Sequence, residues 1–278
     1  MTMLRPASIL RRTAVQAMNA RICMPRIAVA RAMSTSPLLQ QKQDQGFISS
    51  ILHGANDGKE ETNGGDVESG MCKEIYEIQR VNVKPDQIDE YRRMVLDMHP
   101  KLAEHYKDIV EPAGNWEVVV GDIGYFYHFW KFKGYAGYDK LEREVATEPL
   151  LREYRDKLLP LINGRQNWLT QAFTFWTPSL PPKGPDSIYE LRTYNLQPGH
   201  LLEWERDWRR GLEARRPFVE PVGAWFSHVG GLHTVFHIWE YSSLEEREKT
   251  RAAAWQVETV RFIDNMHSQI MRPITFRQ

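Results

Sequence analysis

The sequence predicts an α+β protein built from two tandem copies of one unit, and three observations support this class. The first is an internal repeat, since Ile75-Tyr76-Glu77 and Ile188-Tyr189-Glu190 match at a spacing of 113 residues. The second is a further match, in which Glu111-Pro112 and Glu220-Pro221 stand 109 residues apart. The third is the pattern of strands and helices, which runs in the same order in both copies. The difference between the two spacings places an insertion or deletion in the helix between the matching blocks.

Each copy begins with a strand and a helix. Residues 74–83 and 187–196 are rich in β-branched and aromatic residues, and they end before Pro85 and Pro198, where a strand stops and a helix can begin. Apolar residues then recur at spacings of three and four, which predicts an amphipathic helix in each copy. These residues are Ile88, Tyr91, Val95, Met98 and Leu102 in the first copy, and Leu201, Trp204 and Trp208 in the second.

A hairpin, a second helix and a last strand complete each copy. Glycines within 121–124 and 230–231 mark tight turns between paired strands. Ser243 and Glu246 have the spacing of a capping box at the start of the second copy's helix, and Pro149 is expected to kink or split its counterpart. The last strands are predicted near residues 166–176 and 269–277.

This order of elements is the ferredoxin-like arrangement, in which helices cover one face of an antiparallel sheet and leave the other face bare. A bare apolar face must be buried, and two such sheets in one chain can cover one another. We therefore expect two tandem ferredoxin-like repeats that pack sheet to sheet as a dimeric α+β barrel within one chain. Two copies of the chain could pair their sheets instead, because the linker length alone does not decide between the arrangements.

The amino terminus has the composition of a mitochondrial presequence. The chain of 278 residues balances 36 Lys and Arg against 36 Asp and Glu, but residues 1–33 contain six Arg and no acidic residue. Positive charge on an amphipathic segment suits import driven by the membrane potential, and nucleic-acid binding by a basic tail is the alternative. We expect cleavage after Met33 and a location in the mitochondrial matrix.

The rest of the chain divides at stretches rich in Gly and Pro. Residues 34–71 read as a flexible linker, 72–178 as the first repeat, 179–186 as a Pro-rich linker and 187–278 as the second repeat. No apolar run reaches the length of about 18 residues that a membrane-spanning helix needs. Removal of the presequence would leave Cys72 as the one cysteine, which excludes an internal disulfide.

The second repeat carries the most specific motifs. Ile188 to Gly199 reads IYELRTYNLQPG, and it is followed by a charged helix, by Glu220 to Trp225 (EPVGAW) and by His237 to Trp239 (HIW). With its tandem arrangement, this constellation resembles the NIPSNAP family. The resemblance implies a mitochondrial, often matrix-associated protein with barrel-like domains and no settled enzymatic activity, and roles in mitochondrial signalling, membrane traffic and the clearance of damaged mitochondria. The first repeat departs from the pattern, because Gln79 stands where the second repeat has Arg192.

His128 and His237 are the candidate catalytic residues, with Glu77 and Glu190 as their partners. The two glutamates lie in the first strand of each repeat, beside the strand that carries the histidine. A carboxylate that orients an imidazole inside an aromatic cavity could act as an acid–base pair, and the imidazole could bind a haem. The alternative is a structural histidine wedged between aromatic rings where the two sheets meet.

Trp130, Trp239, Arg192 and Tyr194 are the candidate ligand-binding residues. Each tryptophan follows the candidate histidine of its repeat by two positions, so it shares the same face of its strand. We expect Trp130 and Trp239 to be buried together where the sheets meet, and a small apolar ligand inside the barrel is one interpretation of this lining. The alternative is that both tryptophans belong to the core.

The sequence contains no motif for a metal, a nucleotide or a catalytic nucleophile. It has no GxGxxG, Walker loop, nucleophile elbow or HExxH, and no zinc-site spacing of Cys and His, so we expect no metal, no cofactor and no nucleic-acid partner. We favour a matrix protein that binds protein partners or a small molecule without catalysis. The formation of homo-oligomers is compatible with this interpretation. The alternative is an enzyme of the monooxygenase type acting on a small molecule or a haem, since folds of this kind host such enzymes.

Overall fold

The computed structural model describes residues 74–173, 175–176, 178–180, 186–215, 218–253 and 260–274. The predicted presequence 1–33, the predicted linker 34–71 and most of the predicted linker 179–186 lie outside the described residues. Cys72 lies outside them as well, so the expectation for this thiol stays a prediction.

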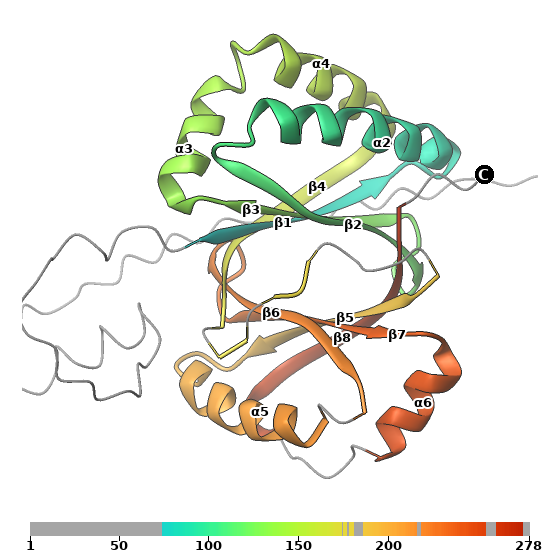
Figure 1. Ribbon diagram of the computed structural model, residues 1–278, viewed down its shortest axis with the longest axis vertical. Helices are drawn as coiled ribbons and strands as arrows, with labels where there is room; N and C mark the ends of the chain where they lie inside the picture. The colour runs from blue at the N-terminus through green and yellow to red at the C-terminus, as the bar shows by residue number, and fades with distance from the viewer. Residues whose placement is uncertain are drawn as a thin grey trace, which may run out of the picture. The chain divides into compact units, whose positions relative to one another are not determined.

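The first repeat follows the predicted order of elements (Figure 1). Its strands are β1 (Ile75–Val83), β2 (Val110–Val120), β3 (Tyr125–Phe132) and β4 (Ile162–Ala172). Its helices are α2 (Ile88–His105), α3 (Gly134–Glu144) and α4 (Pro149–Leu158), with 3-10 turns η1 (Pro85–Gln87) and η2 (Leu159–Leu161). Pro149 begins α4, where its missing N–H breaks no helical hydrogen bond, so the predicted split of this helix is confirmed.

The second repeat has the same order with one helix fewer. Its strands are β5 (Ile188–Leu196), β6 (Glu220–Val229), β7 (Thr234–Tyr241) and β8 (Ile263–Pro273). Its helices are α5 (Leu201–Arg215) and α6 (Leu244–Ala253), with the 3-10 turn η3 (Val260–Phe262). Ser243 caps α6, because its Oγ accepts a hydrogen bond from the Glu246 amide at 3.1 Å, and this half of the predicted capping box is confirmed.

The eight strands form one closed antiparallel barrel in the order β1-β3-β2-β8-β5-β7-β6-β4. Each repeat contributes four neighbouring strands, and hydrogen bonds between β2 and β8 and between β4 and β6 join the two sheets at their edges. The predicted fold class is confirmed, and the barrel closes within one chain without a second copy. Closure leaves none of these eight strands with an unpaired edge.

Side chains from both repeats fill the interior of the barrel. Trp116 and Trp225 are fully buried there, and the ring of Phe129 lies 5.3 Å from the first and 5.1 Å from the second. The same cluster includes Tyr76, Ile78, Val118, Tyr127, Trp168, Tyr189, Leu191, Phe236, Ile238 and Met271. A barrel of eight strands has room for such side chains and little more. The interior is therefore a shared core, and these side chains occupy the space in which a ligand was expected.

A glycine two residues before each interior tryptophan makes room for the indole ring. A Cβ on Gly114 would lie 2.2 Å from Cη2 of Trp116, and a Cβ on Gly223 would lie 2.4 Å from Cη2 of Trp225. These separations are far below van der Waals contact, so only glycine fits at either position. Packing inside the barrel thus explains why the Glu-Pro-x-Gly-x-Trp sequence occurs in both repeats.

Helices cover the outside of the barrel on opposite sides, with α2, α3 and α4 over the first sheet and α5 and α6 over the second (Figure 1). The chain after β4 crosses to the second repeat, where Phe173 and Trp176 join its buried cluster and Trp176 stacks on Trp208 at a ring distance of 5.3 Å. In return, the amide of Ile274, after β8, donates to the carbonyl of Asn115 at 3.0 Å. Each repeat therefore supplies a segment to the helix-covered side of the other.

The last strand of each repeat begins earlier than predicted. β4 begins at Ile162 and β8 at Ile263, and their first halves are polar and exposed. A hydrophobic pattern does not mark such residues, whereas pairing with β1 and β5 fixes them in the sheet. Arg165 and Asn167 belong to this exposed half of β4, which brings them to the edge of the cleft described below.

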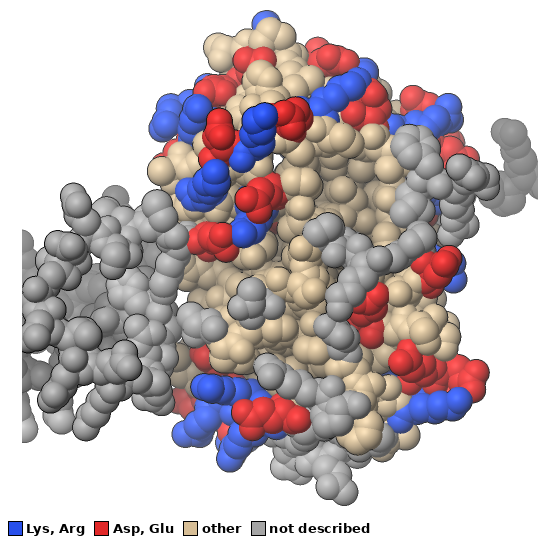
Figure 2. Space-filling model, in the orientation of Figure 1, with Lys and Arg blue, Asp and Glu red and all other residues tan. Residues whose placement is uncertain are grey.

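Charged side chains gather over the two helical layers, and the band across the barrel between them is mostly uncharged on the face shown in Figure 2. Many of these charges form exposed pairs one helical turn apart, such as Lys101 with Asp97, which contribute little to stability. In the part of the chain that the structure describes, no helix combines the length and the apolar character needed to cross a membrane.

Candidate functional site

His128 lies on the outer face of the barrel, under the helices, and not where the two sheets meet. The predicted alternation along β3 is correct, because His128 and Trp130 point to one side and Tyr127 and Phe129 to the other. The second pair is the one inside the barrel. Both sides of β3 are buried, so the hydrophobic pattern alone does not distinguish them. The same holds for His237 on β7, so the interpretation that the histidines are wedged where the two sheets meet is wrong.

Trp130 and Trp239 are both buried, but in separate clusters on opposite sides of the barrel. Trp130 packs with Leu102 and Phe132 beneath α2. Trp239 lies in the buried cluster of the second repeat, where its ring is 5.7 Å from that of Trp176. The prediction that the two tryptophans are buried together is therefore wrong, since the barrel and its packed core separate them.

Neither Glu77 nor Glu190 hydrogen-bonds to a histidine within the described residues. The strand register places Glu77 opposite Trp130, and its carboxylate accepts hydrogen bonds from Nδ2 of Asn167 at 2.6 Å and Nε2 of Gln79 at 3.0 Å. Glu190 stands opposite the tryptophan of β7 in the same way. The predicted carboxylate–imidazole pair is wrong, because the register sets each glutamate beside a tryptophan.

His128 instead belongs to a buried network of hydrogen bonds. Its Nε2 lies 2.7 Å from the Tyr91 hydroxyl, and its Nδ1 lies 2.6 Å from Oδ1 of Asn115. The same oxygen lies 2.9 Å from Nδ1 of His99, whose Nε2 faces the Tyr154 hydroxyl at 3.3 Å. With Asn115 Oδ1 as the shared acceptor, both histidines carry their proton on Nδ1, and both tyrosines donate to Nε2.

Both histidines of this network are neutral near pH 7. Burial lowers the pKa of His99 to about 4, although the hydrogen bond to Asn115 opposes this effect. Burial and the neighbouring His99 hold the pKa of His128 well below its usual value. The Nε2 of His128 already accepts a hydrogen bond from Tyr91, so this buried residue does not fit the role of a haem ligand.

The second repeat replaces this polar network with aromatic packing. Nδ1 of His237 accepts a hydrogen bond from Nε1 of Trp239 at 2.7 Å, and the rings of Tyr194 and Trp208 lie 4.7 and 5.3 Å from its imidazole. At the positions of Tyr91, His99 and Asn115, the second repeat has Trp204, Leu212 and Ala224. The predicted residues Tyr194 and Trp239 thus pack around a buried imidazole.

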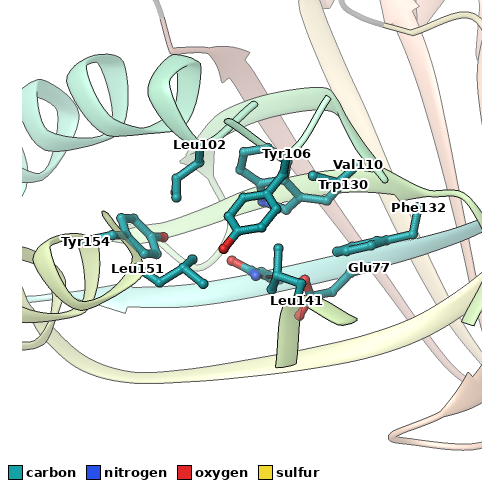
Figure 3. Close-up of a pocket in the computed structure, with 10 residues that line it drawn as sticks. Glu77, Leu102, Tyr106, Val110, Trp130, Phe132, Leu141, Leu151 and Tyr154 are labelled. Carbon is teal, nitrogen blue, oxygen red and sulfur yellow. Dashed lines mark hydrogen bonds between the residues drawn. The ribbon is translucent and has the colours of Figure 1, made fainter. Parts of the chain in front are cut away.

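A cavity in the first repeat lies between the outer face of the sheet and helices α2, α3 and α4 (Figure 3). Its inner chamber has a volume of about 70 Å³, which accommodates a small ring or several water molecules. Most of its wall is apolar or aromatic, formed by Leu102, Tyr106, Val110, Trp130, Phe132, Leu141, Leu151 and Tyr154. Glu77 and Gln79 of β1 complete the wall, so two predicted site residues, Glu77 and Trp130, meet here.

An outer chamber of about 320 Å³ adjoins the inner one and is far more polar. The two chambers share Glu77, Gln79, Leu141, Leu151 and Tyr154. The other residues of the outer chamber are Tyr138, Glu142, Val145, Arg155, Arg165, Gln166 and Asn167. We call the two chambers together the first-repeat cleft. A cleft that joins an apolar chamber to a polar one is typical of small-molecule sites.

Glu77 gives this cleft its electrostatic character. The residue is only 6% exposed, and no cation among the described residues forms an ion pair with it. Burial raises the pKa of its carboxyl, and the hydrogen bonds from Asn167 and Gln79 offset only part of this effect. A carboxyl with a raised pKa next to an apolar chamber can bind a cation or exchange a proton with a bound molecule.

Glu190, in the equivalent place of the second repeat, is held by cations. Nη2 of Arg247 donates to its carboxylate at 2.7 Å and Oγ of Ser268 at 2.6 Å, while Nε of Arg192 lies 3.6 Å away. Burial alone would raise the pKa of Glu190, but these partners outweigh burial and lower it. The predicted residue Arg192 therefore acts on Glu190 of its own chain.

The sequence identified Glu77 and Trp130 of the cleft, but not the residues that close it. Leu141, Leu151 and Tyr154 come from helices that reach the sheet only in the folded protein. Asn115 could have been found, because it stands where the second repeat has Ala224 inside an otherwise matching motif. Among the described residues, no group of His, Cys, Asp and Glu is arranged to hold a metal ion.

Comparisons with known proteins find relatives that match most of the chain. A family model, NIPSNAP, matches residues 189–278. Protein NipSnap homolog 1 of Danio rerio is 31% identical over 242 residues, which cover 84% of this chain and 86% of the relative. Protein NipSnap homolog 2 of Homo sapiens is 33% identical over 211 residues, 72% of this chain and 73% of the relative.

Solved structures extend the likeness beyond detectable sequence similarity. A Lactobacillus acidophilus protein with a provisional assignment as a monooxygenase superposes with a TM-score of 0.54 at 10% identity, over 73% of this chain and 95% of that chain. At this level of identity the likeness concerns the fold alone.

Proposed function

The chain belongs to the NIPSNAP family, and on that premise we propose that it is a non-enzymatic mitochondrial protein whose first-repeat cleft binds a small molecule. In this proposal residues 1–33 direct the chain to the matrix and residues 34–71 form a linker. The bound molecule and protein partners then link the protein to mitochondrial homeostasis or signalling, including the clearance of damaged mitochondria. The proposal includes the formation of homo-oligomers.

The observation that carries the ligand proposal is the cleft, because its apolar chamber adjoins a polar chamber at a buried carboxyl group. The inner chamber would bury the apolar body of a ligand, and the hydroxyl and amide groups of the outer chamber would orient its polar end. We assign ligand contact to Glu77 and Trp130. We assign packing roles to His128, His237, Glu190, Arg192, Tyr194 and Trp239.

The two repeats have different roles in this proposal. Repeats 72–178 and 187–278, joined by the linker 179–186, form one barrel in which the second repeat supports the first. Support comes from Phe173 and Trp176, which leave the first repeat and pack under the helices of the second. We expect neither repeat to fold alone, since each would expose a whole apolar face of its sheet.

Native mass spectrometry of the purified full chain tests the ligand proposal. We expect a small molecule to copurify with the wild type and to be lost in Leu141→Trp, because the larger side chain fills the inner chamber. Leu159→Trp is the matched control, since this exposed leucine lies outside the cleft. Retention of the same molecule by Leu141→Trp would contradict the proposal, and so would a wild type that retains no molecule and binds none.

A fluorescent reporter tests the location. Residues 1–40 fused to the reporter should bring it to the mitochondrial matrix, because these residues contain the arginines of the predicted presequence. Replacing the six arginines of residues 1–33 by glutamine should leave the reporter in the cytosol. A reporter with the natural residues that stays in the cytosol would contradict this part of the proposal.

One observation favours a second candidate function, a small-molecule enzyme of the monooxygenase type. The raised pKa of Glu77 would let this carboxyl take or give a proton beside an apolar chamber. Turnover of an aromatic substrate that is lost in Glu77→Gln and kept in Glu104→Gln, an exposed carboxylate outside the cleft, would support this candidate over binding alone. If the protein binds such a substrate in the cleft and does not convert it, the enzyme candidate is excluded.

A further inference from the structure

The second repeat shows how this fold satisfies the buried glutamate of its first strand. Glu190 is 1% exposed, and the guanidinium groups of Arg247 and Arg192 lie 2.7 and 3.6 Å from its carboxylate. A buried carboxylate is costly unless a cation or several hydrogen bonds compensate its charge. In this repeat the protein itself supplies the cation.

The first repeat has the same glutamate and the same hydrogen-bonding strand, but neither arginine. Gln79 occupies the place of Arg192, as the pairing of both residues with the last strand shows. Tyr138 occupies the place of Arg247 at the spacing of 109 residues that relates the hairpins. Asn167 donates to Glu77 at 2.6 Å, as Ser268 donates to Glu190 at 2.6 Å. The first repeat lacks a guanidinium in contact with the carboxylate, and Arg165 acts on the pKa of Glu77 only from a distance.

The space beside Glu77 is open at the same point. Glu77 and Tyr138 line the outer chamber together, and Glu77 also lines the inner chamber. A buried carboxylate thus faces a cavity, whereas its counterpart faces a guanidinium. We propose that the first-repeat cleft binds a small molecule that carries a cationic nitrogen on an apolar or aromatic body, with Glu77 as its counter-ion. This inference rests on the proposed function and names its ligand class.

The wall of the cleft suits such a cation. Trp130, Phe132 and Tyr154 line the inner chamber beside Glu77, and Tyr138 lies 5.2 Å from Phe132 at the entrance. Aromatic faces attract ammonium groups, and the attraction is strongest where water is excluded. The ring or chain of the ligand would lie against Leu141 and its apolar neighbours, as the converging side chains in Figure 3 indicate.

Arg165 raises a competing possibility, an anionic ligand, which the test must distinguish from a cationic one. Its exposed side chain lines the outer chamber and forms no ion pair or hydrogen bond within the described residues. An anionic ligand would approach this arginine, but it would then meet the buried Glu77 carboxylate farther in. Glu142 and Arg155 line the same chamber, and Arg155 is paired with Asp156 at 3.1 Å, so nearby carboxylates offset part of the positive charge of the two arginines.

Calorimetric titration of the full chain with three probes tests the inference. The probes are 2-phenylethylammonium, the neutral 2-phenylethanol and the anionic 3-phenylpropionate, which share a ring and differ in charge. We expect the ammonium to bind at least about tenfold more tightly than the alcohol, the factor that one charge-assisted hydrogen bond typically supplies. Glu77→Gln should remove this preference, because it keeps the shape of the side chain and removes its charge.

Glu104→Gln is the matched control and should keep the preference, since this exposed carboxylate of α2 lies outside the cleft. Tyr138→Arg is the second variant, in case Glu77→Gln fails to fold. It introduces the residue that the second repeat has at Arg247, so its guanidinium should pair with Glu77 and abolish ammonium binding. Thermal unfolding checks that each variant is folded.

The outcomes separate this inference from the proposed function. Equal binding of alcohol and ammonium, or tightest binding of the anion, would overturn the inference and leave a small-molecule cleft in place, provided that Leu141→Trp removes the binding. Failure of all three probes, together with no copurifying molecule, would overturn both. Ammonium binding that survives in both Glu77→Gln and Tyr138→Arg would also overturn the inference.

Discussion

Glu77 and Glu190 occupy the same place in the two repeats, opposite the tryptophan of the neighbouring strand, yet their surroundings differ in charge. Glu190 is held by Arg247 and Ser268, and its pKa is lowered. Among the described residues, the hydrogen bonds to Glu77 come from the neutral amides of Asn167 and Gln79, and its pKa is raised. The comparison shows that a sealed ion pair in the second repeat corresponds to a carboxyl group that faces an open cleft in the first, where Gln79 and Tyr138 stand in place of the two arginines.

The histidines differ in the same direction. His128 lies in a polar network with Tyr91, Asn115 and His99, which extends to a tyrosine of the cleft wall. His237 is held by the indole N–H of its neighbouring tryptophan and by aromatic rings. The barrel interior, in contrast, uses the same glycine–tryptophan packing in both repeats. The shared core fixes the fold, and the outer layers are where the repeats diverge.

The largest expected effect comes from breaking the ion pair of the second repeat. Arg247→Met should lower the free energy of unfolding by about 3 kcal/mol, because it leaves the buried Glu190 carboxylate with much less compensation. Tyr138→Phe, at the equivalent position of the first repeat, should change it by less than about 0.5 kcal/mol. Urea unfolding at pH 7 measures both. Equal effects of the two variants would erase the contrast between the repeats.

A smaller effect is expected from importing a residue of the second repeat into the polar network of the first. Asn115→Ala should lower the free energy of unfolding by about 2 kcal/mol, since His99 and His128 then lose the acceptor of their Nδ1 protons. The stability of the wild type and of this variant should fall as the pH drops from 6.5 toward 4, because over that interval His99 gains a proton on unfolding. Urea unfolding at pH 7 and pH 5 measures both effects. If Asn115→Ala leaves the free energy of unfolding unchanged, the network contributes nothing to stability.

The smallest expected effect has the opposite sign. Glu77→Gln should raise the free energy of unfolding at pH 7 by on the order of 1 kcal/mol, because the ionised carboxylate destabilises the folded state. The raised pKa means that this penalty is absent below the unfolded value of 4.5 and appears as the pH rises through the folded pKa. The gain should therefore disappear at pH 4. Thermal unfolding across this range measures it, and a loss of stability at pH 7 would contradict the account of Glu77.

The fold could be predicted from the sequence, because strand and helix periodicity repeats twice and the Trp, His and Pro matches fix the alignment of the copies. The face of β3 that lies inside could not be predicted. Tyr127 and Phe129 are as apolar as Phe126 and Trp130, so alternation separates the two sets without saying which one points inward. Only the positions of the helices decide this.

The candidate site was predictable in part for a similar reason. The difference between Gln79 and Arg192 is visible in the aligned repeats and already sets Glu77 apart. Arg247 and Tyr138 belong to a helix after the hairpin, and their approach to the first strand depends on how that helix packs. The cleft wall from α3 and α4 depends on the same packing, which no periodicity in the chain encodes.

Carboxyl titration by nuclear magnetic resonance tests the central contrast most directly. Selective labelling of glutamate side-chain carboxyls with ¹³C in the full chain, with assignments from Glu77→Gln and Glu190→Gln, would report both groups in one sample. The account predicts that Glu77 titrates above the ordinary glutamate value of 4.5 and Glu190 below it. Coincident titrations, or a Glu190 that titrates above Glu77, would contradict it.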